Sequence, residues 1–254
     1  TPQTAFTLLQ SGGVDVFPSG ATWTFVRDAS MGLDFTGVYL YTGQGFLVRR
    51  KSGIRSISQL DGATICVAQG TTLEQNIADY FRARGMHYKI VTFANLERGL
   101  DAYQADRCDA FTNERTSLVG WLHALEDPSA HTILPEVISR EPMAALVRQT
   151  DPRWRDIVLW TFNAQLAAEE LGISQSNVDS IRAKTTNAEA QRLLGTSGNF
   201  GPMLGLSPSW AFNVIKLVGN YADCWTRDFT PLGLARGPNR LYRDGGLFVP
   251  LPFR

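Results

Sequence analysis

The chain is poor in residues that mark several functional classes. It has only three histidines and three cysteines in 254 residues, and they are not spaced as metal ligands. Lys and Arg together number 24, as do Asp and Glu, so the net charge is zero. This balance indicates neither a nucleic-acid partner nor a membrane surface, and no apolar run of about 18 residues could span a bilayer. With 44% hydrophobic and 19% charged residues, the composition predicts a globular protein without a metal site.

Signatures of common enzymes are also missing. The sequence contains no G-x-S-x-G elbow, no phosphate-binding P-loop and no H-E-x-x-H zinc motif. Gly43-Gln44-Gly45 lacks the third glycine of a dinucleotide-binding loop. The start, Thr1-Pro2-Gln3-Thr4, is not a signal peptide, and a signal removed earlier would leave no trace. These absences favour a protein that is not an enzyme.

The middle of the chain alternates between strand and helix patterns. Strands are predicted at residues 64–68, 89–92 and 110–112, and helices at 72–84, 95–105 and 115–125. This order predicts an α/β fold with parallel strand pairing. The flanking segments predict a helix at 4–10, then a strand at 14–17 followed by a turn at Pro18-Ser19-Gly20. Further strands are predicted at 38–41, 45–48 and 143–148, and a helix at 154–171.

The order of these elements predicts two lobes. The α/β unit, residues 46–140, is inserted between residues 1–45 and 141–254, which we expect to form the other lobe together. Two extended runs, near 38–48 and 132–147, would link the lobes as crossover strands. A cleft between two hinged lobes is a common place for a small ligand. The Gly- and Pro-rich tail, 229–254, is expected to wrap over the surface.

A glycine turn after the first strand of the inserted unit is a candidate anion site. Gln69-Gly70-Thr71-Thr72 follows the run 63–68 and precedes a helical pattern. Free backbone N–H groups at a helix start, with threonine hydroxyls, can bind a carboxylate or phosphate. Ordinary helix capping without a ligand explains the same residues.

Two charged residues could bind the ends of an amino acid. Arg27 follows the hydroxyl and aromatic residues of 22–24, and its guanidinium fork suits a carboxylate. A surface pair with Asp28 or Asp34 is the alternative. Glu114 comes at the carboxyl end of a predicted strand, the edge that faces the ligand in open α/β sheets, where it could bind an ammonium group. Its alternative role is to cap the helix that begins near Arg115.

The cysteines leave two possibilities open. Cys66 and Cys108 lie in or beside neighbouring predicted strands, so they could form a disulfide in an oxidising compartment or remain two buried thiols. Cys224 would then be the unpaired thiol, either buried or available to another chain.

A known family has the same order of residues as Arg27, the Gly70-Thr71-Thr72 turn and Glu114 in this chain. The chain resembles periplasmic substrate-binding proteins of polar amino-acid ABC transporters, in the branch that binds L-amino acids generally. The matching stretches are residues 9–16, 22–28, 32–35, 43–46, 62–67, 69–72, 78–81, 107–109, 133–139, 219–221, 231–237 and 252–254. The stretches are spread from residue 9 to residue 254, so the resemblance extends over nearly the whole chain.

The resemblance implies the type II periplasmic-binding fold, with two α/β lobes around a hinge, and a site for an amino acid. Arg27 and the Gly70-Thr71-Thr72 turn would hold the α-carboxylate, while Glu114, Thr22 and Thr36 would hold the α-ammonium group. The resemblance also implies a Cys66–Cys108 disulfide, a periplasmic location and a permease partner in the inner membrane. No cofactor is expected, because the function of such a protein consists only of binding the ligand and closing around the hinge.

Two departures from the family pattern are present. The family usually has aspartate where this chain has Glu114, and one further methylene moves the carboxylate by about 1 Å, which can disturb a tight ammonium site. The family also opens with roughly 70 further residues, a strand–helix–strand unit of the first lobe. We therefore expect a truncated first lobe with an exposed apolar face, covered by a second copy in a homo-oligomer.

The leading interpretation is a solute-binding protein that captures an amino acid for an ABC importer. The alternative is a degenerate, non-transport interaction module that uses the truncated lobe for oligomerisation. An enzyme on the same fold, such as a small dehydratase, would need an acid–base pair in the cleft, where only Glu114 is expected.

Overall fold

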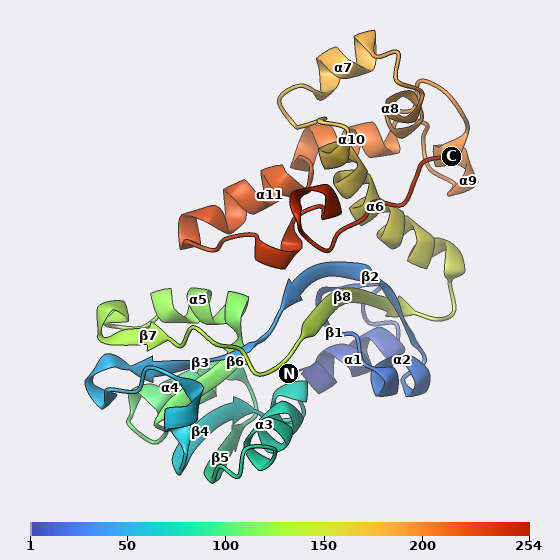
Figure 1. The fold of residues 1–254 in the computed structure, drawn as a ribbon. Helices are drawn as coiled ribbons and strands as arrows, with labels where there is room; N and C mark the ends of the chain where they lie inside the picture. Colours follow the sequence, from blue (N-terminus) through green and yellow to red (C-terminus); the bar gives the residue numbers. More distant parts are fainter. Residues whose placement is uncertain (1) are drawn as a thin grey trace. The chain divides into compact units, whose positions relative to one another are not determined.

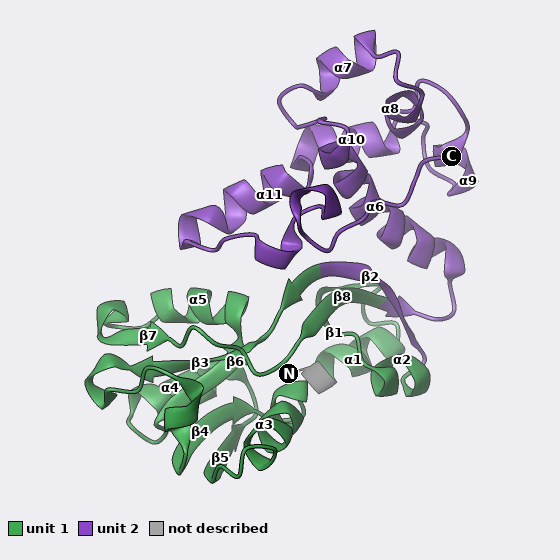
Figure 2. Ribbon diagram, in the orientation of Figure 1, with its two compact units in different colours: residues 1–31, 40–146 green, residues 32–39, 147–254 purple. Residues whose placement is uncertain are grey.

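The computed structural model describes residues 2–254 and divides the chain into two compact units (Figure 2). Unit 1 comprises residues 1–31 and 40–146, and unit 2 comprises residues 32–39 and 147–254. Two strands, β2 (Leu33–Thr42) and β8 (Glu141–Arg148), each have residues in both units. The division into 1–45, 46–140 and 141–254 stays a prediction.

A five-stranded sheet forms the centre of unit 1 (Figure 1). The order is β5 (Tyr88–Phe93), β4 (Ala63–Ala68), β6 (Ala110–Glu114), β3 (Gln44–Arg49) and β7 (His131–Ile133). β4 pairs in parallel with β5 and β6, while β3 runs antiparallel to β6 and β7. The predicted α/β class and the parallel pairing of the three inserted strands are both confirmed.

Three helices cover the two faces of this sheet. Successive strand residues point to opposite faces, so Phe46 and Ile65 join the apolar cluster around α3 (Thr72–Arg82). Their neighbours Leu47 and Cys66 join the cluster on the other face, formed with α4 (Leu96–Gln104) and α5 (Arg115–His123). The central strands β3, β4 and β6 are thus buried on both sides, as expected of strands in the middle of an α/β sheet.

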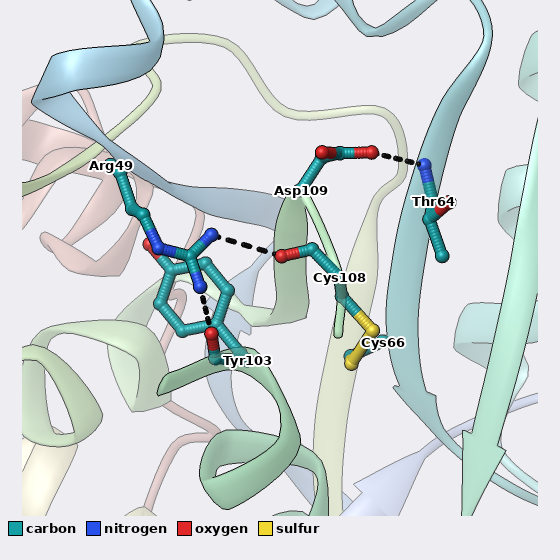
Figure 3. Close-up of a disulfide and its surroundings, with 6 residues drawn as sticks. All are labelled: Arg49, Thr64, Cys66, Tyr103, Cys108 and Asp109. Carbon is teal, nitrogen blue, oxygen red and sulfur yellow. Dashed lines mark hydrogen bonds between the residues drawn. A yellow bond between two sulfur atoms is a disulfide. The ribbon is translucent and has the colours of Figure 1, made fainter. Parts of the chain in front are cut away.

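The predicted disulfide is present in the second of these clusters (Figure 3). Cys66 on β4 and Cys108, just before β6, lie 5.7 Å apart between Cα atoms and are both buried. The Arg49 guanidinium donates to the backbone carbonyls of Cys108, at 2.9 Å, and Tyr103. The bridge therefore ties two parallel strands together at a point where an arginine also binds the chain before β6.

The first strand of unit 1 differs from its predicted position. A strand was expected at 14–17 and a turn at Pro18-Ser19-Gly20, but β1 spans Phe17–Thr22 and includes those three residues. Within the described residues it pairs with β8 alone, in the order β1-β8-β2, and its register shifts between Phe17 and Ala21. An edge strand with a bulge tolerates proline because one of its sides forms no ladder hydrogen bonds. Helices α1 (Pro2–Gln10) and α2 (Phe25–Ser30) flank β1.

Unit 2 is mainly helical. Its long helix α6 (Pro152–Glu170) starts with Asp151 as N-cap and Pro152 in the first turn. The other helices are α7 (Val178–Lys184), α8 (Ala188–Leu193), α9 (Phe200–Met203), α10 (Trp210–Val218) and α11 (Tyr221–Asp228). Their core joins α6 and α10 to Phe253 of the tail. No helix within residues 2–254 is long and apolar enough to cross a membrane.

Candidate functional site

The carboxyl ends of the three parallel strands form one wall of a polar cavity in unit 1. β4 leads through residues 69–71 into α3, β5 leads through 94–95 into α4, and β6 runs directly into α5. In open α/β sheets this edge is where ligands bind, because helix N-termini and loop residues converge there. The cavity has a volume of about 340 Å³ and is also lined by β1, by Arg27 of α2 and by Met143 of β8.

Most of the predicted ligand residues come together at this cavity. Its lining includes five of them: Thr22, Arg27, Thr71, Thr72 and Glu114. Two predicted residues are not brought there. Gly70 is not part of the lining, and its backbone N–H donates to the Glu74 carboxylate at 2.6 Å. Thr36 is buried in the part of β2 that belongs to unit 2.

Arg27 presents a cation to the cavity. Thr24 caps α2 by accepting from the Arg27 backbone N–H, and the guanidinium donates to the Thr22 carbonyl at 3.0 Å. Within residues 2–254, neither Asp28 nor Asp34 forms an ion pair with it, so the surface-pair alternative is not realised. Burial lowers the pKa of Arg27, and the negative charges of Glu141 and Glu114 raise it. A partly desolvated cation of this kind favours an anionic ligand.

Glu114 brings a carboxylate to the same cavity. It occupies the N-cap position of α5, as the alternative interpretation predicted, but its side chain makes no capping hydrogen bond, so the carboxylate is not committed to the helix end. Burial raises the pKa of Glu114, and the nearby Glu141 raises it further; its own backbone N–H and Arg27 act in the opposite direction. A half-buried carboxylate that makes no capping hydrogen bond is suited to a cationic partner.

The threonines of the β4–α3 turn serve different purposes. Thr71 donates its hydroxyl to the Ala68 carbonyl at 2.8 Å, which closes the turn. Thr72 points its hydroxyl toward Thr22, at 3.5 Å between oxygen atoms. The Thr71 hydroxyl closes the turn, whereas the Thr72 hydroxyl lies beside Thr22 in the cavity lining, so Thr72 is the hydroxyl of this turn that best fits a ligand role.

Sequence reasoning missed Glu141, a central polar residue of the site. It lies at the start of β8 and is 2% exposed. Its carboxylate accepts hydrogen bonds from Thr22, from Thr72 at 3.4 Å, from Asn76 at 2.6 Å and from Ser139 at 2.6 Å. Glu141 therefore fixes the hydroxyls of two predicted ligand residues. Nothing in the segment around Pro142 distinguishes this glutamate from an exposed one.

Other polar residues at the carboxyl ends of the strands were also not predicted from the sequence. The reasoning that placed Glu114 at the carboxyl end of a strand applies equally to residues before it and to those following β5. The cavity is lined there by Asn113 and Ser117 and by the start of α4, including Asn95 and Glu97. Applied to every strand end, the same signal would have found them.

The fold and the cavity define a solute-binding protein, and comparison with known proteins agrees. No family model matches the chain. The general L-amino acid-binding periplasmic protein AapJ of Rhizobium johnstonii is 45% identical over 254 residues, which cover 98% of this chain and 74% of AapJ. The glutamate/glutamine/aspartate/asparagine-binding protein BztA of Rhodobacter capsulatus is 43% identical over 257 residues, covering 100% of this chain and 76% of BztA.

A solved structure matches equally well. It is an ABC transporter periplasmic binding protein from Brucella ovis with glutathione bound, 48% identical, with a TM-score of 0.96 over 99% of this chain and 80% of that one. The chain therefore belongs to the family of amino-acid-binding proteins of ABC transporters. These relatives are solute-binding proteins, not enzymes, and none of them supports the non-transport alternative.

Proposed function

We propose that this chain captures an amino acid in the periplasm and delivers it to the permease of an ABC importer. The observation that carries the proposal is a cavity in which a cation, Arg27, and a half-buried carboxylate, Glu114, line the same space. An α-amino acid carries the complementary pair of charges on one carbon atom. The relatives, which are named for amino-acid binding, support this reading.

In the proposed complex, Arg27 and the Thr72 hydroxyl bind the α-carboxylate, and Glu114 binds the α-ammonium group. Thr22 and Thr71 complete the lining, and Glu141 holds Thr22 and Thr72 in place through its hydrogen bonds. Gly70 and Thr36 stay predicted members of the site. The Cys66–Cys108 disulfide suits an oxidising compartment such as the periplasm.

A second ligand class is supported by one observation. The Brucella ovis relative was solved with glutathione bound, and glutathione carries a free α-amino and α-carboxylate pair on its γ-glutamyl residue. The same two charged residues could therefore hold it, and the cavity of about 340 Å³ lies within the range of small-molecule pockets.

Calorimetric titration of the purified chain with the common amino acids and with glutathione tests the proposal. Arg27→Ala should weaken binding more than about tenfold, because a charge-assisted hydrogen bond to a carboxylate contributes about 1.5–3 kcal/mol. Arg82→Ala is the matched control, since Arg82 is exposed at the end of α3 and does not line the cavity. Affinities unaffected by Arg27→Ala, or no binding by the wild type, would refute the proposed site.

A further inference from the structure

Among residues 2–254, one buried side-chain nitrogen of a residue in the cavity wall has no hydrogen-bond partner. Asn113 is 2% exposed, and its side-chain nitrogen Nδ2 is buried with no hydrogen-bond acceptor among residues 2–254. Asn113 also lines the cavity. Buried polar groups in folded proteins are almost always paired, because an unpaired donor loses its hydrogen bonds to water without replacement. The unpaired donor in the cavity wall therefore points to an acceptor that arrives with the ligand.

The pleat of β6 places Asn113 at a different end of the cavity from Glu114. Phe111 packs in the cluster of α4 and α5, and Asn113, two residues on, shares that face. Thr112 faces the other way, where its hydroxyl accepts from Gln44, which also donates to the Leu73 carbonyl of α3. Glu114 shares the face of Thr112.

The cavity therefore has two polar ends. Arg27, Thr72 and Glu114 form the end that suits the α-carbon groups of an amino acid, near the Glu141 network. Asn113 lies at the end formed with the first residues of α4 and α5, which contribute Asn95, Glu97 and Ser117. A ligand anchored by its α-carbon groups at the first end would extend its side chain toward the second.

We infer that Asn113 is a specificity-determining residue that donates to a carbonyl oxygen on the side chain of the bound amino acid, as in glutamine or a γ-glutamyl group. This inference rests on the proposed function. A hydrocarbon side chain would leave the Asn113 amide unpaired, and a site built to donate a hydrogen bond discriminates against such ligands. The Glu97 carboxylate on the same wall can accept from the ligand's amide N–H, which favours an amide over a free acid.

Calorimetry with four ligands tests the preference. Glutamine and glutathione both carry the side-chain carbonyl, norleucine has an unbranched chain without it, and alanine reaches only the first end. Whichever of glutamine and glutathione binds more tightly should bind wild type at least about tenfold more strongly than norleucine. The tighter of the two shows whether the site takes the free amino acid or the γ-glutamyl peptide. Norleucine binding as tightly as both would overturn the inference.

Substitution of Asn113 gives the second test. Asn113→Leu, of similar size, should weaken binding of the preferred carbonyl ligand about tenfold or more, while alanine affinity changes less than about twofold. Asn113→Asp replaces the donor by an acceptor, so it should show the same loss if Asn113→Leu fails to fold.

Unchanged affinity for the preferred ligand in these variants would overturn the role of Asn113. If alanine binding then still depends on Arg27, the proposed function stands and only this inference fails. If no amino acid and no glutathione bind the wild type, both fail.

Discussion

In the proposed site, Glu114 makes the binding of an amino acid depend on pH. The pKa of Glu114 is raised by burial, so it is protonated at a higher pH than an ordinary glutamate, whose pKa is about 4.3. A protonated Glu114 cannot pair with an ammonium group. Amino-acid affinity, measured by titration calorimetry, should therefore fall as the pH is lowered from neutrality into the range in which Glu114 takes up a proton.

The Glu114→Gln variant is the control for this pH effect. It should bind more weakly at pH 7 and show a flatter dependence over the same range. The stability of the ligand-free protein should change with pH in the opposite direction to the affinity. Because the folded-state pKa of Glu114 is raised, its contribution to the free energy of unfolding falls as the pH rises through that pKa. A wild-type affinity independent of pH would contradict the role given to Glu114.

Glu141 is expected to stabilise the protein as well as order the site. Its carboxylate accepts from hydroxyl and amide groups of Thr22, Asn76 and Ser139, and Glu141→Ala removes this shared acceptor. The free energy of unfolding should fall by about 2 kcal/mol or more, measured by urea denaturation. Glu141→Gln keeps one acceptor oxygen and should lose less. Equal stability of wild type and Glu141→Ala would show that the network carries no net stabilisation.

At the scale of secondary structure, the disulfide gives the clearest prediction. It joins positions 42 residues apart, and closing a loop of that length contributes roughly 4 kcal/mol in the chain-entropy model. Thiol titration of the unfolded, unreduced chain should find one free thiol, that of Cys224. Replacing both Cys66 and Cys108 by serine should lower the melting temperature. Three titratable thiols would contradict the bridge.

Elements with strong local sequence patterns were predicted correctly, and elements with weak patterns were not. The strand and helix order of the inserted unit was predictable because apolar runs of β4, β5 and β6 are separated by clear helix patterns. β1 was misplaced because Pro18 and Gly20 read as a turn, and only pairing with β8 shows that they form a bulged edge strand. Glu141 and Asn113 escaped notice because burial and missing partners depend on tertiary packing.

For the whole molecule, association of two or more copies stays a prediction. Unit 2 exposes large apolar side chains, among them Leu217, Met203 and Val249, at 76%, 69% and 64%. Exposed apolar area is unfavourable by about 25 cal/mol per Å². Contact with a second copy of the chain would bury such side chains, and symmetric association is common among identical chains. Light scattering at micromolar concentration should give at least twice the 28.1 kDa of one chain. A monodisperse monomer would refute the homo-oligomer.

The central claim is that one cavity in unit 1 binds an amino acid by its α-carbon groups. The most direct measurement is a crystal structure of the chain with the tightest ligand found by calorimetry. The account predicts the ligand's α-carboxylate within hydrogen-bond distance of the Arg27 guanidinium and its α-ammonium group beside the Glu114 carboxylate. A ligand bound elsewhere, or with its α-carbon groups away from both residues, would contradict the account.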